Sequence, residues 1–402
     1  MTARAMPPRG LYLHVPFCRS LCPYCDFVVV AGAAAFGPRS RIGGYLDAVE
    51  REIDLRAAAA DAMFGSVGGE RPPLETLYLG GGTPSLLPAD RLAALIARVR
   101  DRFGLADGAE VTLEANPGPD ERGDLRAAAE AGVTRLSLGA QAMDEATLRR
   151  LGRRHGPGDV ADAVAAARAA GIGNLSLDLL ADLPDTSVEA WAASLDAAIA
   201  LEPEHLSVYA LTLAFDGEEG GDDRLATPAG ALAWRRRAAA GQDEERAAQE
   251  LELLDVRLPA AGFAWYEISN WARPGAASRH NRLYWERASV AAVGPGAHAF
   301  DGVGRTWNSA DLDAWEGALR RGELPPGGGA APQSPRDDAA EGLVLALRTV
   351  EGVEREVARP FDAAIAWGEE HGLLEEHPGR AGRVRLTLRG RLLSNELFAR
   401  IA

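Results

Sequence analysis

The first half of the chain alternates β-prone and helical segments about six times, and this alternation is the feature that most constrains its fold. Apolar, β-prone runs predict strands at 10–15, 74–79, 110–115, 135–139, 175–180 and 205–211. Helical spacing of apolar residues predicts helices at 41–62, 88–103, 119–131, 144–152, 157–170 and 187–201. Strands that alternate with helices are joined by crossovers, so the pattern predicts an α/β fold with a parallel sheet.

Polar or glycine-rich residues follow most of the expected strands. They are the cysteine loop at 18–25, Gly80 to Thr83, Glu114, Gln141 and Asp178. Ligands in α/β folds bind at the carboxyl ends of the strands, where these residues would gather. An open doubly wound sheet is the alternative, but no glycine fingerprint of the dinucleotide type follows the first strand. We therefore expect a partial, TIM-like barrel of six strand–helix units.

All three cysteines of the chain lie in one short loop, as Cys18, Cys22 and Cys25. So short a loop cannot form two disulfides, but it can direct three thiolates to one metal centre. A cubic 4Fe-4S cluster held by three thiolates leaves its fourth iron open to a small molecule. A zinc site with His14 as the fourth ligand and a chance grouping are the alternatives. The spacing favours the cluster.

The charge and composition of the chain limit the partners that it can bind and the cellular compartment in which it is expected. The chain has 402 residues and a formal net charge of -15, which disfavours nonspecific binding to nucleic acid or anionic lipid. Its N-terminus lacks an apolar run of signal-peptide length, and no apolar stretch reaches membrane-spanning length. With every cysteine in one motif, no disulfide framework is expected. These features predict a cytoplasmic protein.

The sequence changes in character after about residue 213. An acidic, glycine-rich loop is expected at 216–223, helix at 228–258 and an aromatic, β-prone segment at 265–271. The composition of 325–335 is typical of a linker, and 336–402 is compact enough for a small helical or winged-helix-like appendage. The expected division is a barrel domain over 1–215, an α+β extension over 216–325 and the appendage over 336–402.

Several motifs resemble those of the radical S-adenosylmethionine superfamily and, within it, the coproporphyrinogen III oxidase-like group. They are HVPFCRSLCPYCDF around the cysteines, GGGTP at 80–84, EANPG at 114–118, GAQ at 139–141, SLDLLADLP at 176–184 and SVYAL at 207–211. The resemblance implies a partial six-stranded barrel and a 4Fe-4S cluster on Cys18, Cys22 and Cys25, with S-adenosylmethionine on the open iron.

The resemblance also implies the residues that contact S-adenosylmethionine. They are Tyr12, Tyr24, Gly81, Gly82, Thr83, Glu114, Gln141, Arg153 and Asp178. From the residues alone, the two glycines either let a ligand approach the backbone closely or form a plain strand-to-helix turn. Glu114 either holds ribose hydroxyls or an ammonium group, or is an exposed carboxylate. Arg153 can bind a carboxylate through its fork of donors, although without the resemblance a surface arginine is the simpler interpretation.

Two further motifs resemble the HemW-type haem chaperones of this group: YEISN at 266–270 and HNRLYW at 280–285. The oxygen-independent oxidases carry a further cysteine two residues after the third cysteine of the loop, and this chain has Phe27 at that position. They also carry a long N-terminal arm, whereas only eleven residues precede Tyr12 in this chain. The haem candidates are His280 first and His298 second, with Tyr284 and Trp285 beside the former. Without the resemblance, His280 is more simply a buried core histidine.

The resemblance implies haem as ligand and a haem-acceptor protein, not yet identified, as partner, with an electron donor if S-adenosylmethionine is cleaved. By family analogy alone, the protein is expected to contact a membrane at most transiently. An oxygen-independent coproporphyrinogen III oxidase is the alternative function, so the chain is either a chaperone or an enzyme, and a zinc-stabilised binding module is a third. The chain departs from its relatives at Ala181 and Asp185, where glycine is common, and at Ala214 and Phe215, where glutamate is usual.

Overall fold

The protein is built on one twelve-stranded sheet in which seven neighbouring strands are parallel. The structure is a computed structural model that describes residues 4–37, 40–213, 229–332 and 334–402. The strand order is β14-β13-β12-β11-β1-β4-β5-β6-β7-β8-β10-β9. Six of them are β1 (Gly10–Val15), β4 (Leu74–Gly81), β5 (Leu105–Ala115), β6 (Arg135–Gln141), β7 (Asn174–Ala181) and β8 (His205–Ala210). The seventh is β11 (Val290–Val293), which pairs with β1. Strands β1 and β8 do not pair with each other, so the predicted partial barrel of six strand–helix units is confirmed as an open one.

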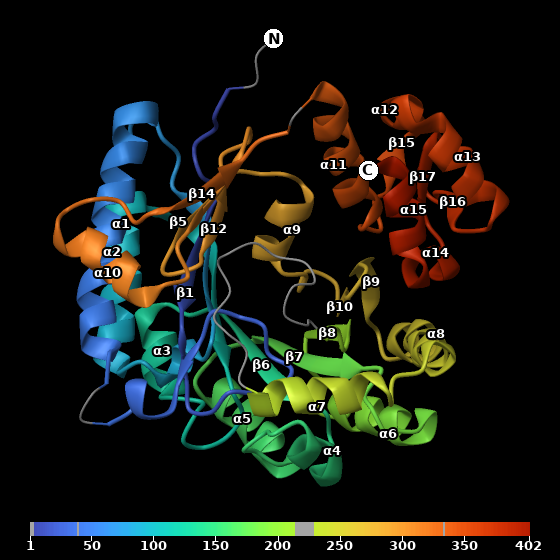
Figure 1. Ribbon diagram of the computed structural model, residues 1–402, viewed down its shortest axis with the longest axis horizontal. Helices are drawn as coiled ribbons and strands as arrows, with labels where there is room; N and C mark the ends of the chain where they lie inside the picture. Colours follow the sequence, from blue (N-terminus) through green and yellow to red (C-terminus); the bar gives the residue numbers. More distant parts are fainter. Residues whose placement is uncertain (1–3, 38–39, 214–228, 333) are drawn as a thin grey trace.

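Helices lie in an arc around the outer side of the curved sheet (Figure 1). They are α1 (Ile42–Phe64), α2 (Ala89–Phe103), α3 (Leu125–Ala131), α4 (Glu145–Arg150), α5 (Pro157–Ala169) and α6 (Val188–Ile199). Each strand alternates its side chains between two faces, so Leu11 and Leu13 pack in the apolar core while Tyr12 and His14 face the other way. The inner face of the sheet is therefore free to carry polar residues.

Strands from the second half of the chain extend both edges of this sheet. On one side lie β11 (Val290–Val293), β12 (His298–Phe300), β13 (Arg305–Asn308) and β14 (Gly327–Ala330), and on the other the hairpin of β9 (Ala264–Glu267) and β10 (Asn270–Ala272). The second half of the chain also contains the helices α7 (Ala229–Ala239), α8 (Glu244–Ala260), α9 (Arg279–Trp285) and α10 (Leu312–Arg320). Near the start of the chain lie the short elements β2 (Phe17–Cys18), β3 (Val30–Ala31), η1 (Gly32–Ala34) and η2 (Pro84–Leu86). The predicted domain boundaries at 215 and 336 stay a prediction.

Residues 335–401 form a small unit with its own apolar core, at the right of Figure 1. Its elements are α11 (Pro335–Leu347), β15 (Val353–Glu354), α12 (Arg355–Ala358), η3 (Arg359–Phe361), α13 (Asp362–Glu370), β16 (Leu374–Glu376), β17 (Arg383–Leu386), α14 (Leu388–Leu392) and α15 (Ser394–Ile401). Strands β15, β17 and β16 form a three-stranded antiparallel sheet in this unit, and its winged-helix-like character stays a prediction. None of the helices in the described ranges is both long and apolar enough to cross a bilayer.

Two predicted helices differ from the structure for local reasons. The helix expected at 119–131 begins only at Leu125, because the Asp124 carboxylate caps it by accepting from the Ala127 N–H at 3.0 Å. The helix expected at 228–258 is two helices, separated near Gly241 and restarted by the Asp243 cap. The acidic loop expected at 216–223 lies outside the described residues, as do Ala214 and Phe215.

The linker predicted at 325–335 is also partly wrong, since β14 pairs with β13 over four residues. Glycine is needed there for close packing: a Cβ on Gly328 would lie 2.3 Å from the Trp307 ring, and one on Gly327 would lie 1.8 Å from the Trp307 carbonyl oxygen. This glycine-rich segment, whose composition is typical of a flexible linker, therefore forms an edge strand that packs against Trp307.

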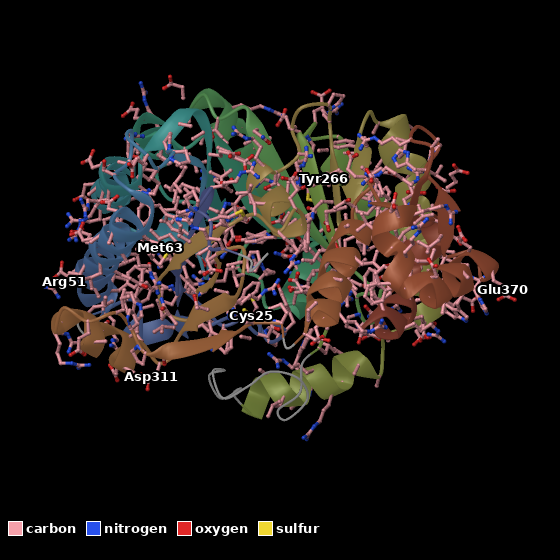
Figure 2. The ribbon with its side chains drawn as sticks, turned by 90° about the horizontal axis from the view of Figure 1, so that it is seen from above. Cys25, Arg51, Met63, Tyr266, Asp311 and Glu370 are labelled. Carbon is pink, nitrogen blue, oxygen red and sulfur yellow. The ribbon has the colours of Figure 1, made fainter. Side chains whose placement is uncertain are left out.

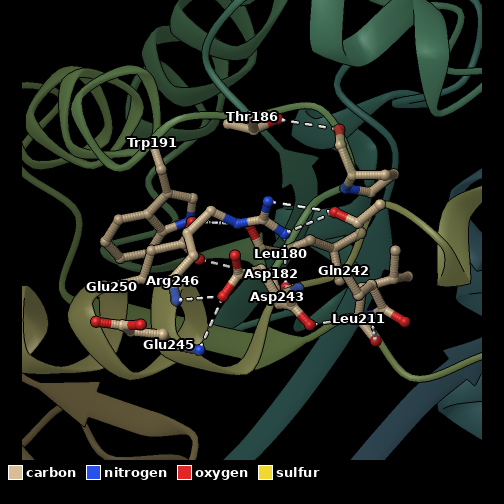
Figure 3. Close-up of polar contacts among 12 residues, drawn as sticks. Leu180, Asp182, Thr186, Trp191, Leu211, Gln242, Asp243, Glu245, Arg246 and Glu250 are labelled. Atoms are coloured by element: carbon tan, nitrogen blue, oxygen red, sulfur yellow. Dashed lines mark hydrogen bonds and ion pairs between the residues drawn. The ribbon is translucent and has the colours of Figure 1, made fainter.

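Two aspartates in the loop after β7 have left-handed backbone conformations, with φ of 52° at Asp182 and 55° at Asp185. The Asp182 carboxylate accepts hydrogen bonds from Gln242, Asp243 and Arg246, as Figure 3 shows, whereas Asp185 is exposed. We expect Asp185→Gly to raise the free energy of unfolding by about 0.5–1 kcal/mol, because it removes the penalty of a left-handed L-residue.

Asp182→Gly is the matched control in a denaturant titration. It relieves the same φ but removes three hydrogen bonds, so it should destabilise the protein. A stability gain at position 182 and none at position 185 would contradict this account of the loop.

Candidate functional site

The carboxyl ends of the parallel strands and the cysteine loop enclose a cavity of about 440 Å³. Figure 2 shows Cys25 near the middle of the molecule, between the N-terminal helices and the C-terminal unit. Of the residues predicted from the sequence, those in its lining are Cys18, Cys22, Cys25, Tyr24, Gly81, Gly82, Thr83, Glu114, Gln141, Arg153 and Asp178. Residues far apart in the sequence are brought together because the strand ends of a parallel sheet share one edge.

Two of the three thiols, those of Cys18 and Cys22, accept hydrogen bonds from side chains of the barrel. Thr83 Oγ1 donates to Cys18 Sγ at 3.6 Å, and Arg153 Nη1 donates to Cys22 Sγ at 3.3 Å. All three cysteines are half-buried. Burial raises the pKa of the Cys18 thiol to about 11 and that of the Cys25 thiol to about 12. Groups so buried become good ligands only when a positive centre lies beside them.

A chain of polar contacts connects the first two cysteines through Asn116. The Asn116 amide donates to Thr83 Oγ1 at 3.1 Å and accepts from Arg153 Nη2, which also donates to the Gly139 carbonyl at 2.9 Å. The contacts therefore run from Cys18 to Cys22 across the ends of β4, β5 and β6. Asn116 was part of the EANPG motif but not among the predicted residues, because an asparagine before proline is usually a turn residue.

The surroundings of the thiols fit a cluster. A Cβ on Gly82 would lie 3.0 Å from Cys18 Sγ and 2.7 Å from the Phe17 carbonyl oxygen, so only glycine leaves this approach open. No three His, Cys, Asp or Glu side chains among the described residues come close enough to share a single metal ion. A four-iron cubane does not require this, since each thiolate binds a different iron.

Glu114 forms the acidic side of the cavity and is firmly oriented. Its carboxylate accepts from the Tyr78 hydroxyl at 2.7 Å and from the Gly81 N–H at 2.9 Å. Gly81 has a φ of 112°, and a Cβ there would lie 2.5 Å from the His14 ring. Burial raises the pKa of Glu114 to about 7, so the group changes charge readily near neutral pH. Such a carboxylate can accept from hydroxyls or pair with an ammonium group.

The other predicted S-adenosylmethionine contacts have different settings. Asp178 accepts from the Ser137 hydroxyl at 3.2 Å, and burial raises its pKa. Gln141 ends β6 with a φ of 67°, and the buried hydroxyl of Tyr24 has no hydrogen-bond partner within the described part of the chain. Tyr12 is not in the cavity lining: its hydroxyl contacts His14 Nδ1 at 3.1 Å, and its ring packs beside Tyr78.

His280 does not reach the cavity. It is 1% exposed, and both ring nitrogens are hydrogen-bonded, Nδ1 to Thr76 Oγ1 at 2.7 Å and Nε2 to the Tyr284 hydroxyl at 2.9 Å. Burial lowers its pKa to about 3, which keeps the ring neutral. In this arrangement His280 fastens α9 to β4, and neither nitrogen faces a ligand.

The remaining haem candidates are also outside the cavity lining. Tyr284 is 37% exposed, and the Trp285 ring lies under the Arg348 guanidinium at 4.5 Å. His298 is exposed on β12, where its ring stacks on Trp307 with 5.6 Å between centroids. The structure thus brings together the predicted cluster and cofactor residues, Tyr12 excepted, and separates them from the predicted haem residues.

Several cavity residues were missed from the sequence. They include Tyr78, Arg135, Ser137, Ser207, Tyr209 and Asn281. Tyr78, Arg135 and Ser137 occupy inward positions of strands whose apolar positions alone were used in the prediction. Alternation along β4 and β6 could have found them, because residues two apart share a face.

A model of the Radical SAM superfamily matches residues 12–198, which together with the open barrel and the cysteine loop defines a radical S-adenosylmethionine-type protein. The heme chaperone HemW of Mycobacterium tuberculosis is 40% identical over 96% of this chain and 93% of that protein. The heme chaperone HemW of Bacillus subtilis is 30% identical, over 97% of this chain and 98% of that protein. The chain therefore belongs to the HemW family. The solved coproporphyrinogen III oxidase HemN of Escherichia coli shares the fold, with a TM-score of 0.79 at 20% identity over 100% of this chain and 91% of that one.

Proposed function

We propose that the protein is a haem chaperone of the radical S-adenosylmethionine type, which binds haem and passes it to an acceptor protein. The observation that carries the proposal is the match to HemW relatives over nearly the whole chain, combined with the cavity that holds all three cysteines. The acceptor is a protein still to be identified, and a cytoplasmic location accords with the reducing environment that three free thiols require.

Cys18, Cys22 and Cys25 would hold the 4Fe-4S cluster, and the glycines at the end of β4 would lie beside S-adenosylmethionine. The bound cluster supplies a one-electron reductant for cleavage of a sulfur–carbon bond, if the family chemistry is used here. Glu114 would accept hydrogen bonds from the cofactor, and Arg153 donates to Cys22, Asn116 and Gly139. Arg153 would therefore orient the loop as well as a ligand carboxylate.

The alternative function is oxidative decarboxylation of coproporphyrinogen III. The shared fold with HemN is compatible with it, but Phe27 stands where the oxidases have a further cysteine. In this structure Phe27 is 64% exposed at the cavity. An exposed aromatic ring there offers an apolar contact and no additional thiolate.

For the haem ligand, exposure favours His298 over His280. His298 is exposed on β12, whereas His280 is 1% exposed and both of its ring nitrogens are hydrogen-bonded. We expect His298→Ala to weaken haem binding about tenfold or more, the loss that corresponds to about 1.4 kcal/mol. A spectroscopic haem titration of the purified variant measures this.

His280→Ala is the matched variant for that titration. It should lower the free energy of unfolding by about 2 kcal/mol, because Thr76 and Tyr284 lose a buried partner, and leave the haem affinity of the folded protein unchanged. If haem affinity falls only in His280→Ala, then His280 and not His298 is the haem ligand.

The chaperone function itself is tested by loading the protein with haem and mixing it with an excess of apomyoglobin as acceptor. We expect one haem per chain to bind saturably and then move to the acceptor. The absence of saturable binding by cluster-loaded protein would refute the proposal.

A further inference from the structure

Helix α7 contacts the cysteine loop from a position more than two hundred residues later in the chain. Arg235 on this helix is 3% exposed. Its Nε donates to the Pro23 carbonyl at 3.0 Å, and its Nη2 donates to the Cys25 carbonyl at 2.7 Å. Both carbonyls belong to the short segment that carries the last two thiols.

The residue before it fixes the same helix to the barrel. Trp234 Nε1 donates to the carbonyl of Arg150, the last residue of α4, at 3.1 Å, and its ring lies 6.2 Å from that of Tyr24. Both rings pack against a buried apolar cluster that includes Leu151 and Leu211. Adjacent residues of α7 therefore bind the cysteine loop and the strand ends that the loop covers.

The far end of α7 is anchored as well. Asp182, after β7, accepts from Gln242 Nε2 at 3.1 Å and from Arg246 Nη2 at 2.7 Å (Figure 3). Gln242 Nε2 also donates to the Leu211 carbonyl at 2.6 Å. The turn between α7 and α8 is thus tied to the ends of β7 and β8, which leaves α7 little freedom to move away from the loop.

We propose that Arg235 is a positioning residue for the cluster-binding loop. By holding the carbonyls of Pro23 and Cys25, it fixes the direction of the thiols of Cys22 and Cys25 and places a guanidinium charge behind them. This inference rests on the proposed function only in so far as the loop carries a cluster. The reduction potential of an iron–sulfur cluster depends on nearby charge and on solvent exposure, so both effects of Arg235 reach the cluster.

The test compares Arg235→Ala, Arg235→Gln and Arg235→Lys with Arg236→Gln, which removes an exposed charge from the same helix. The first measurement is anaerobic alkylation of the three thiols in the cluster-free protein. We expect Arg235→Ala to react about tenfold faster than wild type, which corresponds to about 1.4 kcal/mol of easier loop opening. Arg236→Gln should react at the wild-type rate.

The second measurement is the midpoint potential of the reconstituted cluster. Arg235→Gln and Arg235→Ala should shift it to more negative values, because the reduced cluster loses a nearby positive charge, and Arg235→Lys should restore most of the shift. Wild-type alkylation rates in Arg235→Ala would overturn the proposal, as would faster alkylation with an unchanged potential, which indicates only structural support. A wild-type protein that assembles no cluster refutes the proposed function instead, and the alkylation comparison then still decides the loop contact.

Discussion

Replacing Cys22 with serine is expected to give a folded chain that no longer assembles a four-iron cluster. After anaerobic reconstitution, iron and acid-labile sulfide should fall from about four of each per chain to well below one, since two thiolates and a hydroxyl do not hold a cubane. The fold should survive, because Cys22 lies outside the apolar core and a serine Oγ can accept the Arg153 hydrogen bond in its place. Metal and sulfide analysis with a visible spectrum measures the loss, and circular dichroism checks the fold.

Ser20→Ala is the matched control for Cys22→Ser, because it alters a polar residue of the same loop that also lines the cavity. It should retain the wild-type iron and sulfide content. A Cys22→Ser protein with the same content as Ser20→Ala would mean that the cysteine trio is not the cluster site. Zinc without sulfide in the wild type would favour the zinc-stabilised alternative.

The largest effect on stability is expected from Glu52, a carboxylate with no exposed surface in the middle of α1. It accepts from the Gly294 N–H at 2.8 Å, from Asn308 Nδ2 at 2.8 Å, from Trp315 Nε1 at 2.9 Å and from Arg56 Nε at 2.7 Å. One side chain thus satisfies donors from α1, the β11–β12 loop, β13 and α10. Removing it leaves several buried donors without an acceptor.

Glu52→Leu should therefore lower the free energy of unfolding by about 3 kcal/mol or more. Asp47→Asn is the control on the same helix: Asp47 is exposed and lies 3.6 Å from Arg91, so its loss should change stability by less than about 0.5 kcal/mol. Denaturant titration measures both. Equal, small effects would contradict the conclusion that residues 290–320 are built into the same folded unit as α1.

The parallel core could be predicted because each strand is a largely apolar run and most of these runs end at a glycine or a polar residue. The predicted cofactor residues lie together for the same reason: Thr83, Glu114 and Asp178 each lie at or near the carboxyl end of a parallel strand, and parallel strands bring those ends to one edge. Topology alone therefore determined most of the cavity lining.

Contacts between distant segments could not be predicted. Nothing in the sequence of α7 indicates that Arg235 donates to the carbonyls of Pro23 and Cys25. Every residue has a main-chain carbonyl, so the identity of the accepting residues gives no signal. The setting of His280 was equally hidden, because its partner Thr76 lies 204 positions away. The two hydrogen bonds of His280 join α9 to β4, and the HNRLYW motif alone gives no sign of them.

We infer that the protein carries haem and does not oxidise the haem precursor coproporphyrinogen III. The most direct measurement is anaerobic incubation of cluster-loaded protein with S-adenosylmethionine, a reductant and coproporphyrinogen III, followed by quantification of protoporphyrinogen IX, with a haem titration of the same preparation. The account predicts saturable haem binding and no more protoporphyrinogen than in a protein-free control. Formation of protoporphyrinogen IX with matching consumption of S-adenosylmethionine would contradict it.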